Sequence, residues 1–290
     1  MHRYKILGEL ITFNNTQGLD LDGILYQNDT NKTTIIHIHG SLGNFYQNQF
    51  LRLMAKHYLN VGINLLSFNL GCHDGVGEGY LYENDFKYIG GSITDFSTCI
   101  FDIEGAINFT SQFSERIILQ GHSLGCDRIL HFLISQKKNY DFILLAPCDS
   151  YQLQANWIAP ETVEAQIERL KAEAKSEDIF DWLPSREYGI RGNGENYVIP
   201  ITRKALLSII QGPPYRLIRI GNPSKFSLKQ RALIYIGGKD ALQTEPSEVM
   251  FKYLEERIHD VTRVYVPQGA HSLEGCEYEV IEKIIKWTMI

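Results

Sequence analysis

The sequence predicts an α/β fold with a mostly parallel, eight-stranded sheet, helices on both faces and one long insertion. Two observations lead to this prediction. Short apolar runs alternate with segments of helical periodicity along most of the chain, as expected for parallel strands joined by crossover helices. The alternation stops at Cys148 and resumes after Gln230, so we assign residues 1–147 and 231–290 to one core and residues 148–230 to an insertion.

Composition excludes several other classes of protein. The chain has 290 residues, of which 44% are hydrophobic and 21% charged, enough to bury one large core. The net charge of -6 and the lack of a long basic run argue against a nucleic-acid partner. No stretch is long and apolar enough to span a bilayer and the N-terminus lacks a signal-peptide pattern, so we expect a cytoplasmic protein. Five scattered cysteines without a C-x-x-C pair are typical of reduced thiols.

The first elements form one edge of the predicted sheet. Residues 14–18, NNTQG, are a turn-forming link between two strand-like runs, Tyr4–Phe13 and Leu19–Gln27, so we expect an antiparallel hairpin. Thr33–His39 is rich in β-branched residues and is typical of a central strand. The next buried strand is Asn64–Asn69, and the helix before it is predicted over residues 45–58.

A loop and a long helix come next. Leu70–Gly79 is rich in glycine, but its glycines do not fit the G-x-G-x-x-G pattern of a dinucleotide site, so we interpret it as a flexible loop. Ser92–Phe113 has apolar residues at three- and four-residue steps, which predicts a helix. Either Ser92 or Thr94 is placed to cap that helix.

The motif around which the chain is organised is GHSLG at residues 121–125. A short buried-strand run, Ile117–Leu119, precedes it, and a helical pattern, Leu124–Gln136, follows it. This is the context of the G-x-S-x-G nucleophile elbow, in which a strand turns sharply into a helix and presents a serine at its apex. We expect the flanking glycines to be needed because neighbouring chain packs too closely for a Cβ, and the serine to take strained backbone.

The pattern after the elbow is interrupted by the insertion. Asp141–Ala146 is a buried strand, and two helices are predicted within the insertion, at Glu161–Ser176 and Arg203–Gln211. The first half of the insertion is rich in acidic residues and the second half in basic ones. The core pattern then resumes with strands at residues 232–236 and 261–266 and ends with helices at 246–258 and 278–287.

Four side chains that could take part in catalysis follow predicted strands: Ser41, Ser123, Asp240 and His271. The carboxyl ends of parallel strands meet at one edge of a sheet, so we expect these residues to lie close together. A serine hydroxyl becomes a good nucleophile when a base accepts its proton and a carboxylate orients that base. The sequence therefore predicts Ser123 as nucleophile, His271 as base and Asp240 as the orienting acid.

With these motifs the whole chain resembles an α/β-hydrolase. The matching segments are GHSLG at 121–125, HG at 39–40, IGGKD ending at Asp240 and GAH ending at His271, and the order Ser, Asp, His is the order of that family. The resemblance implies a catalytic triad of Ser123, Asp240 and His271. It also implies an oxyanion hole made by the backbone N–H groups of Ser41 and Leu124, with Leu42 as a substitute donor, and a cap formed by residues 148–230.

A weaker similarity is to the fungal siderophore-ester hydrolases. It rests on YIGGS at 88–92, GHSLGCD at 121–127 and PIT at 200–202.

The function expected from the triad is hydrolysis of a small-molecule carboxylic ester or thioester through an acyl-serine, without a cofactor or a metal. Two alternatives use the same fold. An acyltransferase would pass the acyl group to an amine or alcohol, and a receptor would bind a ligand without catalysis.

Several residues have alternative interpretations. Asp149 also follows a strand and could replace Asp240 as the acid. His37 and His39 lie on one face of a strand and could join residues 72–74 around a metal. His122, beside the predicted nucleophile, is interpreted as a packing residue.

The insertion carries more apolar residues than a solvent-facing excursion needs, so we expect a mainly apolar pocket beneath it. These residues are Trp157, Ile158, Trp182, Leu183, Tyr188, Tyr197, Val198, Ile199 and Ile201. We also hypothesise that one of Arg186, Arg191 and Arg203 reaches the pocket and favours an acyl substrate with a remote anionic group.

Overall fold

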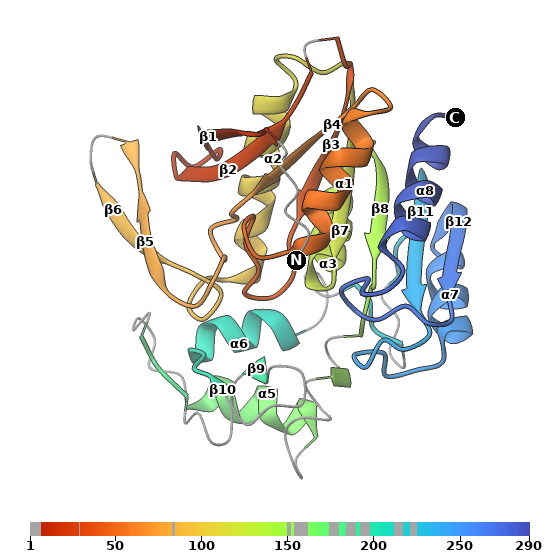
Figure 1. Cartoon of the computed structure of the whole chain (residues 1–290). Coiled ribbons are helices and arrows are strands. Elements are labelled where there is room, and N and C mark those ends of the chain that lie inside the picture. Colours follow the sequence, from red (N-terminus) through yellow and green to blue (C-terminus); the bar gives the residue numbers. More distant parts are fainter. Residues whose placement is uncertain are drawn as a thin grey trace.

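An eight-stranded sheet is the centre of the computed structural model, which describes residues 7–28, 30–82, 85–149, 152–153, 162–173, 180–183, 190–191, 198–211, 217–220 and 225–290. The strands are β1 (Glu9–Asn14), β2 (Asp20–Tyr26), β3 (Thr33–Ile38), β4 (Ile63–Phe68), β7 (Arg116–His122), β8 (Asp141–Leu145), β11 (Leu228–Gly237) and β12 (Ile258–Val266). Their order across the sheet is β1-β2-β4-β3-β7-β8-β11-β12 (Figure 1).

The direction of the strands confirms the predicted topology. β1 and β2 form the expected antiparallel hairpin, and β2 is also antiparallel to β4. The pairs from β4 through β3, β7, β8 and β11 to β12 are all parallel. The carboxyl ends of β3, β7, β11 and β12, which precede the four predicted site residues, therefore lie at the same edge of the sheet.

Helices cover both faces of the sheet (Figure 1). They are α1 (Gln49–Leu59), α2 (Cys99–Thr110), α3 (Leu124–Ser135), α7 (Ser247–Glu255) and α8 (Glu277–Thr288). Neighbouring residues of β3 face opposite layers, because successive side chains of a strand alternate. Ile35 packs in the apolar cluster that contains α1 and α8, whereas Ile36 packs in the cluster that contains α2, α3 and α7.

Two helix starts differ from the predictions. α1 begins at Gln49 instead of residue 45, because the Asn44 side chain accepts hydrogen bonds from the backbone N–H groups of Tyr46 and Gln47 and holds a turn there. The helix predicted from Ser92 begins with a 3₁₀ turn at Phe96–Thr98. Its cap is Asp95, which accepts from the N–H of Ser97, so the prediction of Ser92 or Thr94 as the cap was wrong.

The segment predicted as a flexible loop contains a strand. β5 (Gly77–Tyr80) pairs with β6 (Phe86–Ile89) in a two-stranded antiparallel ribbon. This ribbon extends from one side of the molecule (Figure 1). Its four-residue strands are short and have no clear apolar alternation, so only the pairing between them shows that they are strands.

The insertion has its own small apolar core. It lies at the helices α5 (Val163–Ala172) and α6 (Arg203–Ile210) and the residues next to them. The buried residues of this core are Leu170, Leu183, Ile201, Ala205, Leu206 and Ile210. Two short strands, β9 (Ile190–Arg191) and β10 (Val198–Ile199), form a separate ribbon. β11 begins at Leu228, so residues 228–230 belong to the sheet although the sequence pattern assigns them to the insertion.

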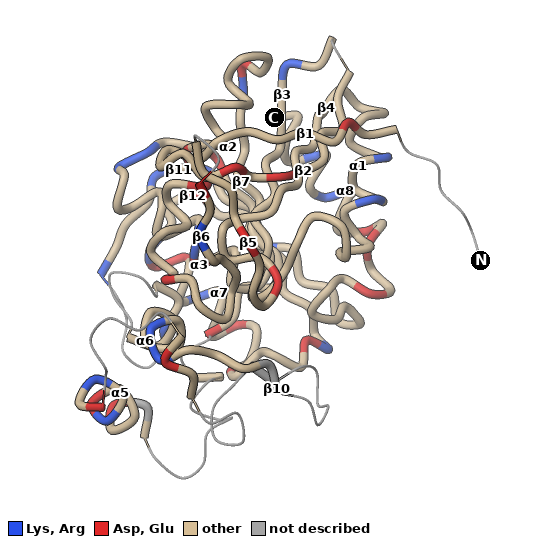
Figure 2. The backbone as a smooth tube through the Cα atoms, turned by 90° about the vertical axis from the view of Figure 1, so that its left-hand side faces the viewer, with Lys and Arg blue, Asp and Glu red and all other residues tan. Residues whose placement is uncertain are grey.

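Oppositely charged residues from the two halves of the insertion pair with each other. Arg203 Nε lies 2.6 Å from Asp181 Oδ2, and Arg219 Nη2 lies 3.0 Å from Glu164 Oε1. Figure 2 shows both signs of charge on α5. The segregation of charge in the sequence therefore contributes to the internal packing of the insertion.

Among the described residues, no helix has both the length and the hydrophobicity of a membrane span. The cytoplasmic location expected from the sequence stays a prediction.

Candidate active site

Ser123 lies at the sharp turn between β7 and α3, as the elbow motif predicts. Its backbone has φ 55° and ψ -126°, a conformation that residues other than glycine rarely adopt. The turn is held on both sides, because the Ser123 N–H donates to Leu145 O at 2.9 Å and the Ser123 carbonyl accepts from Cys126 N–H at 2.9 Å. The strained serine is thus fixed by the sheet and by the first turn of the helix.

The two glycines of the motif have the steric role that we expect from the sequence. A Cβ built on Gly121 would lie 2.6 Å from the carbonyl carbon of Gly125, and one built on Gly125 would lie 2.2 Å from Ile38 O. Both obstacles are backbone atoms, which cannot rotate away. The packing of Gly121 on Gly125 and the close approach of Gly125 to β3 therefore require glycine at both positions.

We predict that Gly125→Ala lowers the free energy of unfolding by at least about 2 kcal/mol, because the new methyl group overlaps backbone of β3. The measurement is urea denaturation followed by circular dichroism. Gly77→Ala is the matched control, since a Cβ there meets no atom within 4 Å, and its effect should stay within about 0.5 kcal/mol. Equal unfolding midpoints for the two variants would contradict the steric argument.

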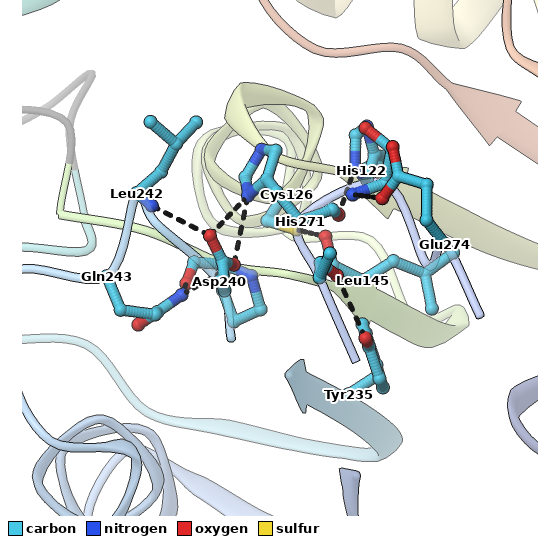
Figure 3. Close-up of polar contacts among 12 residues, drawn as sticks. His122, Cys126, Leu145, Tyr235, Asp240, Leu242, Gln243, His271 and Glu274 are labelled. Carbon is cyan, nitrogen blue, oxygen red and sulfur yellow. Dashed lines mark hydrogen bonds and ion pairs between the residues drawn. The ribbon is translucent and has the colours of Figure 1, made fainter. Parts of the chain in front are cut away.

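His271 and Asp240 are joined directly, as the proposed roles of base and acid require. His271 Nδ1 lies 3.0 Å from Asp240 Oδ1 and 2.9 Å from Oδ2 (Figure 3). The Asp240 carboxylate also accepts hydrogen bonds from Leu242 N–H at 2.9 Å and from Gln243 Nε2 at 3.2 Å. Burial raises the pKa of Asp240, but the hydrogen bond and charge of His271 and these other donors outweigh it, so the pKa lies below its usual value.

Asp149, the alternative acid, has other partners. Its side chain is buried, with Oδ1 accepting from Gln152 N–H at 3.0 Å and Oδ2 accepting from Ile220 N–H at 2.8 Å. Among the described residues, its carboxylate makes no contact with His271. The geometry therefore favours Asp240 as the acid and makes Asp149 an anchor for the segment at 217–220.

His122 connects Ser123 with the loop that carries His271. Its Nε2–H donates to the backbone carbonyl of His271 at 2.9 Å, and the two imidazole rings are 5.0 Å apart (Figure 3). Burial and the neighbouring His271 lower the pKa of His122 to about 3, so the ring stays neutral. The interpretation of His122 as a packing residue was thus incomplete, because the side chain also holds the base loop by a hydrogen bond. Among the described residues, Ser123 Oγ and His271 are not hydrogen bonded.

The predicted oxyanion loop lies against the nucleophile. A Cβ built on Gly40 would come within 2.9 Å of Ser123 Cβ, and Leu42 has a positive φ of 52°. The backbone N–H groups of Ser41 and Leu124 donate to no described residue, so both can bind a developing negative charge. Ser41, Leu42 and Leu124 line one small recess beside Ser123, which we call the oxyanion recess.

Described residues of the insertion are hydrogen bonded to the core at several positions. Thr202 N–H donates to Ser92 O at 2.8 Å, and Phe96 N–H donates to Ser208 Oγ at 2.9 Å. Asp127 of α3 accepts from the N–H groups of both Leu217 and Ile218 at 3.0 Å, and Asp149 holds Ile220. Ile209 of α6 lines the oxyanion recess itself.

The apolar residues predicted to line the pocket are only partly described. Leu183 and Ile201 pack into the small core of the insertion, and Trp182 is 41% exposed. Those that lie outside the described residues are Trp157, Ile158, Tyr188 and Tyr197, and the side chains of Val198 and Ile199 are not described either.

Of the three candidate arginines, only Arg203 has a described side chain. Its guanidinium is committed to ion pairs with Asp181 and Glu173, so the suggestion that it reaches the pocket is not supported. Arg186 lies outside the described residues, as does the side chain of Arg191.

The metal alternative has no support in the described geometry. His39 uses both ring nitrogens, with Nδ1 2.9 Å from Gly40 O and Nε2 accepting from Leu70 N–H at 3.1 Å. His37 Nδ1 accepts from Gln120 Nε2 at 3.0 Å. Within the described ranges, no group of three or more potential ligands is suited to hold a metal ion.

Arg128 is a residue of the recess that the sequence reasoning missed. Arg128 lines it together with Ser41 and Leu124 and is only 3% exposed. Residues four apart on a helix share a face, so its position four residues after Leu124 could have placed it there.

Comparisons with known proteins identify the fold. No family model matches the sequence, and a search of curated proteins finds no match either. Solved structures do match over nearly the whole chain. An esterase from Pyrococcus furiosus is 15% identical, with a TM-score of 0.60 and coverage of 99% of this chain and 95% of its own.

Two further structures extend this comparison. Est1E from Butyrivibrio proteoclasticus, solved with ferulic acid bound, is 14% identical, with a TM-score of 0.62 and coverage of 96% and 97%. Mouse α/β-hydrolase domain-containing protein 10 is 19% identical, with a TM-score of 0.60 and coverage of 97% and 98%. The protein therefore has the α/β-hydrolase fold, as the sequence motifs predict. The similarity to siderophore-ester hydrolases stays a prediction.

Proposed function

We propose that this protein is a serine hydrolase that cleaves a carboxylic ester or thioester through an acyl-serine intermediate. The observation that carries the proposal is the strained Ser123 at the end of β7, with the hydrogen-bonded pair His271 and Asp240 at the ends of neighbouring strands. The similarity to esterases and hydrolases of the same fold supports it.

In the proposed reaction, His271 Nε2 accepts the proton of the Ser123 hydroxyl as Oγ attacks the substrate carbonyl carbon. The oxygen of the resulting tetrahedral intermediate is bound by the N–H groups of Leu124 and Ser41. His271 then gives the proton to the leaving alcohol or thiol, and an acyl-serine remains. A water molecule, deprotonated by His271, releases the acid and restores Ser123.

Asp240 has two tasks in this scheme. Its hydrogen bonds to Nδ1–H keep the proton on that nitrogen, so that Nε2 is free to accept the serine proton. Its charge stabilises the imidazolium that forms. Both tasks need an ionised carboxylate, and the lowered pKa of Asp240 keeps it ionised at neutral pH.

The proposed mechanism requires a hydrogen bond between Ser123 Oγ and His271 Nε2 when substrate is bound. Catalytic hydrogen bonds are often long in the free enzyme and shorten in the complex.

The proposal is tested by labelling with a fluorophosphonate probe, which reacts with activated serines. We expect stoichiometric labelling of the wild-type protein, with mass spectrometry locating the phosphonate on Ser123. Heat-denatured protein is the control. Absence of labelling in folded protein would support the non-catalytic receptor instead. Labelling at another serine would reject Ser123 as the nucleophile.

A further inference from the structure

Arg128 is a buried arginine without a described acidic partner in contact. It lies on α3 one helical turn beyond Leu124, and its side chain is almost fully enclosed. Among the described residues, no carboxylate forms an ion pair with it. Burying an uncompensated guanidinium is costly, by several kcal/mol in general, so such a residue usually has an anion nearby or binds one.

The hydrogen bonds of Arg128 leave part of its guanidinium unused. Nη1 donates to two carbonyl oxygens of the oxyanion loop, His39 O at 2.6 Å and Gly40 O at 3.0 Å. No described residue accepts a hydrogen bond from Nη2, and Nε is buried without any partner. The Nε–Nη2 edge, which presents two parallel N–H groups, is the edge that binds carboxylates in bidentate fashion.

Asp102 is a buried carboxylate that interacts electrostatically with Arg128, and it already has other partners. Asp102 accepts from Asn15 Nδ2 at 2.7 Å and from Gly71 N–H at 2.9 Å, one on each oxygen. Burial raises the pKa of Asp102 to about 6, in spite of those donors and of the positive charge of Arg128. Among the described contacts, Asp102 forms no ion pair with Arg128, and its two oxygens are already engaged.

The recess that contains Arg128 lies on the side of Ser123 away from His271. Besides Arg128, its lining residues are Ser41, Leu42, Cys72, Gly91, Thr94, Phe96, Leu124 and Ile209. No described residue from the loops after β11 and β12 is among them. In the sheet, β3 and β4 are on one side of β7, whereas β11 and β12 are on the other. Because His271 must protonate the leaving group, the leaving group lies on its side and the recess takes the acyl part.

We propose that Arg128 is the recognition residue for a carboxylate carried by the acyl part of the substrate. This inference rests on the proposed serine-hydrolase function and assigns its substrate class: a half-ester or half-thioester of a short dicarboxylic acid. The carboxylate binds the Nε–Nη2 edge while the scissile carbonyl oxygen meets the N–H groups of Ser41 and Leu124. Ile209 closes the recess from the insertion, so binding requires an outward shift of that side chain.

The test compares two esters of matched length, para-nitrophenyl hemiglutarate and para-nitrophenyl valerate, in which a methyl group replaces the carboxylate. We expect wild-type protein to have the higher kcat/KM for the hemiglutarate. In Arg128→Gln, the ratio of the two kcat/KM values should fall about 10- to 100-fold, as expected for loss of a charge-assisted bidentate contact. The ratio for Arg128→Lys should lie between those of the wild type and of Arg128→Gln, because lysine keeps the positive charge but lacks the planar guanidinium.

A purely structural role predicts a different pattern. If Arg128 only holds the carbonyls of His39 and Gly40, its loss lowers kcat/KM for both esters by the same factor, and the ratio stays at the wild-type value. That result, or a wild-type preference for the valerate, would overturn the proposal. Arg203→Gln is the matched control, since that arginine pairs within the insertion, and it should keep the wild-type ratio.

A binding measurement separates this inference from the proposed function. Ser123→Ala protein cannot form an acyl-enzyme, and monomethyl glutarate should raise its Tm whereas methyl valerate should not. The rise should disappear in the double variant Ser123→Ala, Arg128→Gln. If wild-type protein is not labelled by the fluorophosphonate but Ser123→Ala protein still shows the Tm rise, the hydrolase is rejected and the anion site is kept. If wild-type protein is labelled at Ser123 but monomethyl glutarate does not raise the Tm of Ser123→Ala protein, the anion site alone is rejected.

Discussion

Ser123→Ala is expected to lower kcat for ester hydrolysis by about 10³- to 10⁶-fold, as found for nucleophiles of catalytic triads. The physical reason is that the hydroxyl is the proposed nucleophile, carried by the strained backbone of the elbow. Alanine removes a single oxygen atom from a partly exposed side chain, so the fold should persist. The measurement is kcat with a para-nitrophenyl ester, with the Tm recorded by circular dichroism.

Ser135→Ala is the control for this prediction. Ser135 ends the same helix and its hydroxyl makes only a long contact of 3.5 Å to Phe132 O, so both kcat and Tm should stay near the wild-type values. Full activity in a correctly folded Ser123→Ala protein would reject the serine mechanism.

Asp240→Asn is expected to lower kcat by about 10⁴-fold while leaving the protein folded. An asparagine amide can donate to His271 Nδ1 and so favours the tautomer that carries its proton on Nε2, which cannot accept a proton from serine. The charge that stabilises the imidazolium is lost as well. The measurement is kcat of the wild type and of Asp240→Asn, determined by steady-state kinetics at several pH values around neutrality.

Asp149→Asn is the matched control, because Asp149 is also a buried aspartate that follows a strand. Its two acceptor contacts go to backbone N–H groups, and an asparagine oxygen can keep one of them. We expect a far smaller loss of kcat than for Asp240→Asn. The reverse ranking of the two variants would move the acid to Asp149.

Much of the fold could be predicted because its determinants are local. The eight strands, their order along the chain and the antiparallel edge follow from runs of apolar residues and from turns such as residues 14–18. The elbow could be predicted for the same reason, since its motif, the apolar run before it and the helical pattern after it lie in one short stretch. The obstacle that requires glycine at 125, Ile38 O of β3, is distant in the sequence. Helix starts were less certain, because side-chain caps such as Asn44 and Asp95 compete with the helical pattern.

By itself, the sequence determined the α/β architecture, the place of Ser123 at a strand-to-helix turn, and the short list of residues that could serve it. Only the tertiary structure shows which of those residues lie in contact. Asp240 and Asp149 both follow buried strands, and the difference between them is which neighbour each carboxylate meets: His271 for one and the backbone of Ile220 for the other.

The partners of the arginine side chains could also be found only in the tertiary structure. Arg203 looked suited to a pocket but pairs with Asp181, whereas Arg128, unremarked in the sequence, lies behind the oxyanion loop with part of its guanidinium unpaired. A sequence pattern records periodicity over a few turns or strands. The partner of a polar side chain depends on contacts between residues far apart in the chain. Burial then sets how much each contact contributes to the free energy of folding.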